Sequence, residues 1–226
     1  MALYRLGPVL AFPDPMEAEP DGLIAVGGDL SVGRLKAAYL AGIYPWYSEG
    51  DPILWWSPDP RMVLFPSEMH VPRSLRKRMR TGAFEMRWNT AFTAVVEACA
   101  NAPRPDQEGT WITASMREAY GAFHEAGYAM SVEAWIDDAL VAGLYGVSMG
   151  RCFFGESMYT LVPDASKACL VELVERLGSL GVEMIDCQMY TEHLARFGAR
   201  EITRREFLGH VRAHCDEGRP LQSVNG

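Results

Sequence analysis

The spacing of hydrophobic residues changes from a helical to a strand period near residue 129. Residues 89–102 and 114–128 carry apolar side chains three and four positions apart, which predicts two amphipathic helices. Residues 129–136, 139–149 and 151–159 are short runs rich in β-branched and aromatic residues, and turn residues separate them. This pattern predicts three antiparallel strands in a meander.

The helical period returns after the meander. Residues 164–181 predict a helix with an N-cap at Asp164, and residues 182–190 predict another strand. Residues 191–200 and 203–215 predict two closing helices. Helices that surround a mostly antiparallel sheet make an α+β fold.

Residues 1–62 differ in composition from the rest of the chain. They predict loops and turns around one helix, which begins after a cap at Ser31 and stops before Pro45. We therefore expect a small N-terminal domain over 1–62 and a larger domain over 63–226. The stretch 43–66 concentrates prolines and three tryptophans, and we expect a stiff connector in which Trp55 and Trp56 pack between the domains.

The overall composition is that of a globular protein. Of 226 residues, 49% are hydrophobic and 22% are charged, and no run approaches the ~18 apolar residues of a membrane span. We expect a protein of the cytoplasm that does not bind membranes. The five cysteines are scattered without a C-x-x-C pair, so reduced thiols are expected. His210 and His214 lack a third ligand at helical or hairpin spacing, so no metal site is predicted.

The charge is unevenly distributed. A net charge of −8 argues against a non-specific nucleic-acid binder, which gains affinity by neutralising phosphates. Residues 73–80 nevertheless hold five basic side chains and no acid: Arg73, Arg76, Lys77, Arg78 and Arg80. Taken alone, this run is either a solvated helix face or a phosphate-binding surface.

Two predicted strands carry acids at positions that should be buried. The period of two places Asp186 and Gln188 on one face of the strand at 182–190. It places Glu156 and Met158 on one face of the preceding strand if Gly155 introduces no bulge. If these strands are neighbours, the polar groups line one apolar cavity, the usual form of a small-ligand site. A structural hydrogen bond to a loop is the other interpretation of the buried acid.

The order of elements is also that of GNAT-type acyltransferases, but the stretch "GESMYTLVPDASKACL" lacks the glycine-rich pyrophosphate turn of CoA-dependent members. Acetyl-CoA is therefore disfavoured. Several stretches together resemble the leucyl/phenylalanyl-tRNA–protein transferases: "PDGLIAVGGDLS", "GIYPWYSEGDPILWWSPDPRMVL", "EGTWIT", "FFGESMY", "DASK" and "IDCQ". The resemblance extends from about residue 12 to about residue 210.

The resemblance implies an enzyme of the N-degron pathway. It would take Leu, Phe and, less readily, Met from aminoacyl-tRNA and join it to the N-terminal amine of proteins that begin with Lys or Arg. A GNAT-like C-terminal domain without metal or CoA is implied, and a monomer is the default. Residue by residue, the resemblance implies an amino-acid pocket and an adenosine wall. The pocket falls on Leu144, Phe153, Met158, Leu173 and Ile185, and the wall falls on Tyr39, Trp46 and Trp111.

The resemblance also assigns roles to polar residues. Asp186 would polarise Gln188, whose amide oxygen would accept a hydrogen bond from the attacking amine, and Glu156 would orient the donor or attract the cationic acceptor. The basic run from Arg73 to Arg80 would contact tRNA phosphates. Differences from the family pattern, among them Leu144, Leu161, Leu173 and Thr191, leave the choice among amino acids and acceptors open. Three other interpretations remain: a CoA-dependent acyltransferase, a transferase with another acceptor, and an aminoacyl-tRNA-binding protein without catalysis.

Overall fold

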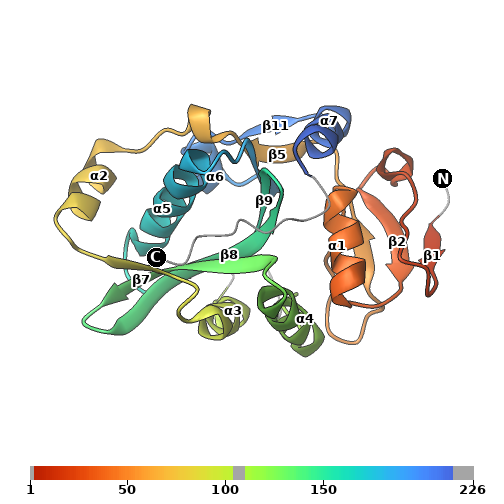
Figure 1. Ribbon diagram of the computed structural model, residues 1–226, viewed down its shortest axis with the longest axis horizontal. Helices are drawn as coiled ribbons and strands as arrows, with labels where there is room; N and C mark the ends of the chain where they lie inside the picture. The colour runs from red at the N-terminus through yellow and green to blue at the C-terminus, as the bar shows by residue number, and fades with distance from the viewer. Residues whose placement is uncertain (1–2, 104–109, 216–226) are drawn as a thin grey trace.

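The computed structural model describes residues 3–103 and 110–215, which form two β-sheets and the helices around them (Figure 1). The smaller sheet has the strand order β1-β2-β4-β3 and is accompanied by one helix. Its members are β1 (Tyr4–Leu6), β2 (Leu23–Gly27), α1 (Val32–Leu40), β3 (Tyr44–Pro45) and β4 (Leu54–Trp56), with a 3-10 turn at Pro15–Glu17. The predicted helix and its Ser31 cap are confirmed, since Ser31 accepts a hydrogen bond from the Arg34 N–H.

The expectation that residues 1–62 hold only loops and turns besides that helix is wrong. The strands of this sheet are two to five residues long, which is too short for a period of two to stand out. The stretch 43–66 is likewise not a connector, because it supplies the β3–β4 hairpin and the first strand of the larger sheet. Trp55 is fully buried within the small sheet, where its Nε1 donates to the carbonyl of Gly27 over 2.9 Å.

The larger sheet has seven strands in the order β11-β5-β10-β9-β8-β7-β6. These strands are β5 (Arg61–Leu64), β6 (Glu85–Trp88), β7 (Ala129–Ile136), β8 (Ala139–Met149), β9 (Cys152–Thr160), β10 (Met184–Gln188) and β11 (Arg200–Ile202). The predicted meander is confirmed as β7, β8 and β9, which pair antiparallel in sequence order. Among the described strands of this sheet, β10 and β9 form the single parallel pair. β10 lies in the interior of the sheet, between β5 and β9.

Helices cover both faces of the larger sheet. They are α2 (Arg73–Arg80), α3 (Phe92–Asn101), α4 (Ala114–Glu125), α5 (Ala165–Ser179), α6 (Glu192–Ala195) and α7 (Arg204–His214), with a 3-10 turn at Pro66–Glu68. α3 and α4 pack on one face and α5 on the other (Figure 1). The predicted α+β fold with a sheet between helices is confirmed. The helix predicted over 191–200 is only one turn long, because the chain then enters β11.

Asp164 stands at the expected N-cap position of α5, but its side chain does not cap the helix. The carboxylate instead accepts hydrogen bonds from Lys167 and Arg78.

A continuous hydrophobic core joins the two sheets. One cluster of buried side chains includes Ala25 and Trp55 from the small sheet and Val63 and Tyr145 from the large one. A second cluster fills the space between the large sheet and α5. The expected domain boundary after residue 62 falls inside β5. No helix within residues 3–103 and 110–215 is long and apolar enough to cross a membrane.

Candidate functional site

A pocket of about 300 Å³ lies beside the point where β9 and β10 stop pairing. It is lined mainly by apolar side chains, with polar groups on one side. The structure brings together there the residues expected from the sequence to form the amino-acid pocket and its polar groups: Leu144, Phe153, Glu156, Met158, Leu173, Ile185, Asp186 and Gln188. The remaining lining residues include Tyr145, Ser157, Leu170, Cys187, Thr191, His193 and Leu194.

Two β-bulges shape this pocket. Tyr145 pairs with Ser157 while Gly146 pairs with Gly155, so Glu156 is an extra residue in β9. A bulge reverses which face the following side chains occupy. Phe153 and Met158 therefore both line the pocket, although their numbers have opposite parity. The prediction that Glu156 and Met158 share a face was made for a strand without a bulge, a condition that β9 does not meet.

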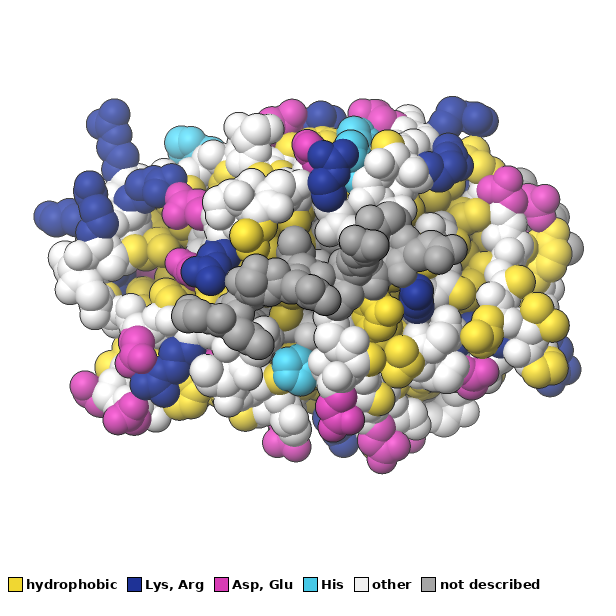
Figure 2. All heavy atoms as spheres, viewed as in Figure 1, with side chains coloured by type: hydrophobic (Ala, Val, Ile, Leu, Met, Phe, Trp, Pro, Cys, Tyr) yellow, Lys and Arg dark blue, Asp and Glu magenta, His cyan; other side chains and the backbone are white. Residues whose placement is uncertain are grey.

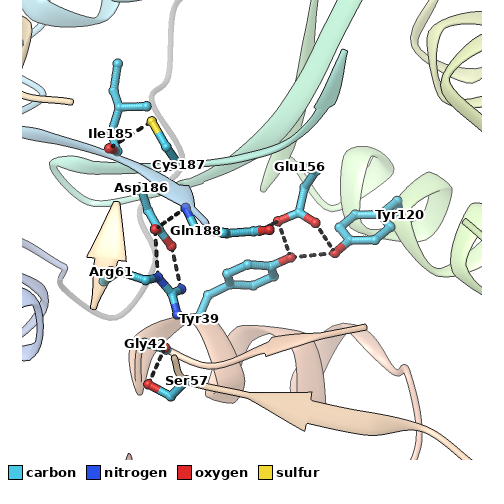
Figure 3. Close-up of polar contacts among 10 residues, drawn as sticks. All are labelled: Tyr39, Gly42, Ser57, Arg61, Tyr120, Glu156, Ile185, Asp186, Cys187 and Gln188. Atoms are coloured by element: carbon cyan, nitrogen blue, oxygen red, sulfur yellow. Dashed lines mark hydrogen bonds and ion pairs between the residues drawn. The ribbon is translucent and has the colours of Figure 1, made fainter. Parts of the chain in front are cut away.

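The second bulge is in β10. Asp186 pairs with Val63 and Gln188 pairs with Met62, which leaves Cys187 as the extra residue. Gln188 takes a left-handed backbone conformation with φ +64°. Residues other than glycine rarely adopt this conformation. Its carboxamide thereby leaves the strand toward the bulge in β9, where Nε2 donates to Glu156 Oε1 over 3.2 Å (Figure 3).

Glu156 is buried at the centre of a hydrogen-bond network. The Tyr39 hydroxyl donates to Oε1 and the Tyr120 hydroxyl to Oε2, each over 2.7 Å, and the two hydroxyl oxygens are 2.5 Å apart (Figure 3). Burial raises the pKa of Glu156 to about 7, although the two tyrosine hydrogen bonds act in the opposite direction. The carboxyl group can therefore change its charge near neutral pH.

Asp186 is fully buried and pairs with Arg61, which is also fully buried. Arg61 Nε donates to Oδ1 over 2.8 Å and Nη2 to Oδ2 over 2.6 Å (Figure 3). The Gln188 backbone N–H also donates to Oδ1 over 2.8 Å. Asp186 thus binds the backbone of Gln188, whereas the carboxamide of Gln188 binds Glu156.

Arg61 and Tyr120 are site residues that the sequence reasoning missed. A buried carboxylate needs a cationic or hydrogen-bonding partner, and this requirement was the only available signal for Arg61. Tyr120 gave no signal, since a tyrosine on the apolar face of a helix is ordinarily a core residue. Cys187 is no candidate nucleophile, because burial and the charge of Asp186 raise the pKa of its thiol and keep it protonated.

The three aromatic residues expected around an adenosine differ in their exposure. Tyr39 has no exposed surface, because its ring packs against Phe123 and Phe154. A place for Tyr39 in an adenosine wall stays a prediction. Trp46 and Trp111 are partly exposed and pack against the core from outside the pocket. An adenosine contact by these two rings stays a prediction.

The basic run forms α2, an amphipathic helix whose Leu75 is buried. Arg76 pairs with Glu175 over 2.7 Å and Arg78 with Asp164 over 3.3 Å. In the described part of the chain, Arg73, Lys77 and Arg80 are exposed and take part in no ion pair. Figure 2 shows Lys and Arg side chains projecting from the end of the molecule where Figure 1 places α2. Contact with tRNA phosphates stays a prediction for this helix.

A metal centre finds no support in the side-chain geometry. Across residues 3–103 and 110–215, no group of three His, Cys, Asp or Glu side chains is placed to hold an ion. His210 and His214 lie with their rings 5.9 Å apart, and His214 Nδ1 contacts Arg151. All five cysteines are reduced thiols.

Comparison with known proteins identifies relatives over most of the chain. The family model described as "Leucyl/phenylalanyl-tRNA protein transferase" matches residues 63–212, and the model of its N-terminal domain matches residues 28–59. A leucyl/phenylalanyl-tRNA–protein transferase of Anaeromyxobacter sp. strain K is 57% identical over 211 residues, covering 93% of this chain and 91% of the relative. The one from Nitrosospira multiformis is 61% identical over 189 residues, covering 84% and 81%.

A distant likeness exists among solved structures. A GCN5-related N-acetyltransferase from Kribbella flavida shares 13% sequence identity at a TM-score of 0.38, covering 73% of this chain and 58% of that chain.

Proposed function

This chain belongs to the leucyl/phenylalanyl-tRNA–protein transferase family, and from that premise we propose a specific reaction for it. It is an aminoacyltransferase that moves an amino acid from tRNA to proteins. We propose that the donors are Leu-tRNA, Phe-tRNA and, less readily, Met-tRNA. The acceptor is the α-amine of a protein that begins with Lys or Arg, and the product is marked for degradation by the N-degron pathway.

The observation that carries this proposal is the apolar pocket beside Gln188. Its deep walls come from Leu144, Phe153, Leu173 and Ile185, and each of these side chains is almost fully buried. An apolar side chain such as Leu or Phe gains free energy by leaving water for such a cavity, at roughly 25 cal/mol per Å² of apolar surface. A charged side chain placed against these four walls would lose its hydration without gaining a polar partner from them, which disfavours it as the donor side chain.

The polar side of the pocket suits amide formation. The ester of aminoacyl-tRNA is already activated, so the enzyme must mainly hold the amine against the carbonyl carbon. A C–N bond forms, the ester C–O bond breaks, the amine loses a proton, and the departing ribose oxygen gains one. Gln188 Nε2 is used in the bond to Glu156, which leaves Oε1 as the acceptor for an amine N–H. A neutral amide is too weak a base to take the proton, so Gln188 orients the amine.

Glu156 supports the same reaction through its charge. Ionised, it would attract the cationic N-terminal residue of the acceptor, and it holds the Gln188 carboxamide in place. Glu156→Gln should therefore raise the KM for the acceptor peptide more than the KM for Phe-tRNA. An effect confined to Phe-tRNA would contradict attraction of the acceptor.

The experiment that tests the donor and acceptor together is a product analysis by mass. The protein is mixed with Phe-tRNA, Leu-tRNA or Met-tRNA and with peptides that begin with Lys, Arg, Asp or Ala. We expect one Phe or Leu residue added to the Lys and Arg peptides, and slower addition of Met. Equal addition to the Asp or Ala peptides would contradict the proposed acceptor.

The role of Gln188 has its own test. Gln188→Ala removes one oriented hydrogen bond, worth roughly 1.4 to 2.8 kcal/mol in the transition state. We expect single-turnover transfer from Phe-tRNA to fall about 10-fold to 100-fold, with the Kd for Phe-tRNA unchanged. A transfer rate equal to that of the wild type would show that Gln188 does not orient the amine.

A further inference from the structure

Arg61 is a fully buried cation at the junction of the two sheets. It is the first residue of β5, the strand with which the chain enters the larger sheet. Its guanidinium lies 4.7 Å from the ring centre of Tyr44 and 4.4 Å from that of Phe207. Tyr44 belongs to β3 of the small sheet and Phe207 to α7. The position of Arg61 is therefore set by three separate parts of the chain.

The guanidinium holds Asp186 by both carboxylate oxygens, over 2.8 and 2.6 Å. This two-point contact fixes the plane of the carboxylate as well as its distance. Burial opposes the charge on Arg61, but the charge of Asp186 and its hydrogen bonds outweigh burial and raise the pKa of Arg61. Arg61 therefore stays charged and keeps its hold on Asp186.

Asp186 in turn fixes the backbone of Gln188. Its Oδ1 accepts the Gln188 N–H over 2.8 Å, at the residue whose φ is +64°. This backbone conformation is unfavourable for glutamine, so the surrounding contacts must hold it. It is also the conformation that directs the carboxamide toward Glu156 rather than along the regular strand.

We propose that Arg61 is a positioning residue for amide formation, acting through Asp186 on the backbone, and hence on the carboxamide, of Gln188. Arg61 does not touch substrate, and Asp186 serves as the link that transmits its position. The proposal rests on the orienting role of Gln188 proposed above. It departs from the expectation that Asp186 polarises the carboxamide directly, because both of its oxygens bind other groups.

The test is a double-mutant cycle between Arg61 and Gln188. Arg61→Lys keeps the charge but cannot reproduce the two-point contact. We expect it to slow single-turnover transfer from Phe-tRNA to a Lys-starting peptide about 10-fold to 100-fold, the effect of a small misplacement of a reacting group. The Kd for Phe-tRNA should change by no more than about threefold, because Arg61 does not line the donor pocket.

The decisive measurement is the double variant. If Arg61 acts through Gln188, Arg61→Lys combined with Gln188→Ala is no slower than Gln188→Ala alone. Multiplied losses would overturn the proposal, as would a normal transfer rate in Arg61→Lys or a loss of Phe-tRNA affinity that accounts for the slower transfer.

Arg34→Lys is the matched control. Arg34 is also fully buried, but it donates to the backbone carbonyls of Gly7 and Val9, which follow β1 of the small sheet. We expect Arg34→Lys to lower the unfolding temperature. In an assay run about 20 °C below the unfolding temperature of the variant, the transfer rate should equal that of the wild type. If Arg34→Lys slows transfer as much as Arg61→Lys does, the effect is general loosening and the proposal fails.

A wild-type rate for Gln188→Ala would instead remove the role of Gln188 itself, so the two failures can be told apart. If Arg61→Lys does not fold, Asp186→Asn takes its place in the same cycle. Asp186→Asn retains one oxygen for the Gln188 N–H and loses the ion pair with Arg61.

Discussion

At the scale of single residues, the site depends on acids that are buried with different partners. Asp186 has a cation and Glu156 has two tyrosine hydroxyls and a carboxamide. A carboxylate without a cation in a low-dielectric interior is penalised by burial, which explains why the pKa of Glu156 is raised to about 7. The two buried carboxyl groups therefore differ in their partners, an ion pair for Asp186 and neutral hydrogen-bond donors for Glu156.

Glu156 should make the stability of the protein depend on pH. Because its pKa is raised from 4.5 to about 7, the neutral form is favoured in the folded protein. The raised pKa of Glu156 adds about 3 kcal/mol to the free energy of unfolding. This contribution is complete below pH ~4.5 and is lost as pH rises through ~7. Glu156→Gln should abolish this loss of unfolding free energy with rising pH, so that the variant is more stable than the wild type at pH 8.

Urea unfolding of both proteins between pH 4.5 and 8 measures this difference. A free-energy gap that does not widen with pH would show that Glu156 is ionised throughout the range.

At the scale of elements, two interruptions of regular strand pairing lie where the pocket is formed, and others lie in the β7–β8 and β2–β4 pairs. The bulges at Glu156 and Cys187 are on neighbouring strands. A regular β9 would place Phe153 and Met158 on opposite faces, and the pocket would lose a wall. A bulge depends on how two strands pair, so neither strand's own sequence reveals it.

Gly146 is the glycine opposite this bulge, and it should not tolerate a side chain. A Cβ at Gly146 would lie 2.3 Å from the carbonyl oxygen of Phe154 and 2.5 Å from the ring of Phe153. Gly146→Ala should therefore lower the free energy of unfolding by roughly 1 to 3 kcal/mol and raise the KM for Phe-tRNA, since the Phe153 ring forms part of the pocket.

Gly155→Ala is the matched control, because its Cβ would meet only the Asp186 carbonyl oxygen at an ordinary 3.5 Å. Urea unfolding compares the two variants, because Gly155 itself lines the pocket and its variant is no neutral reference for kinetics. Equal effects would mean that the close approach at Gly146 is not what shapes the pocket.

The helix α2 should contribute to tRNA binding unequally along its length. Arg73, Lys77 and Arg80 can release counter-ions from phosphates, whereas Arg76 and Arg78 already pair with acids. Lys77→Ala or Arg80→Ala should lower the slope of log K against log salt by about one if the side chain contacts a phosphate.

The affinity for Phe-tRNA at several salt concentrations measures this slope. Arg76→Ala serves as the comparison and should change the slope less. An unchanged slope in all variants would place α2 away from the tRNA.

At the scale of the whole molecule, the two sheets share one core. Side chains from β2, β4, β5 and β8 belong to the same buried cluster. The site itself spans both parts, since Tyr39 is on α1 and Tyr120 on α4. Unfolding of the small unit alone would expose the core that it shares with the larger sheet, which is unfavourable.

We therefore expect one unfolding transition. Tryptophan fluorescence, which includes the fully buried Trp55 of the small sheet, should coincide in urea with the loss of secondary structure measured by circular dichroism. Two separated transitions would show that the small sheet is an independent domain.

The sequence alone determined the parts of this protein that depend on local pattern. The meander, α1 and its Ser31 cap, and the α+β class follow from periods that extend over many residues. The family-specific stretches pointed to the aminoacyltransferase. Spacing also placed the polar residues Glu156, Asp186 and Gln188 beside one cavity, whereas the resemblance supplied most of the apolar lining residues that were anticipated.

Only the tertiary structure decided which groups meet in the site. The short strands of residues 4–56, the two bulges, the burial of Tyr39 and the partner of Asp186 all depend on contacts between distant segments. Arg61 and Asp186 are 125 positions apart in the chain. A buried carboxylate needs a partner because burying an unpaired charge is costly. The sequence indicates this need at Asp186 but does not show that Arg61 is the partner.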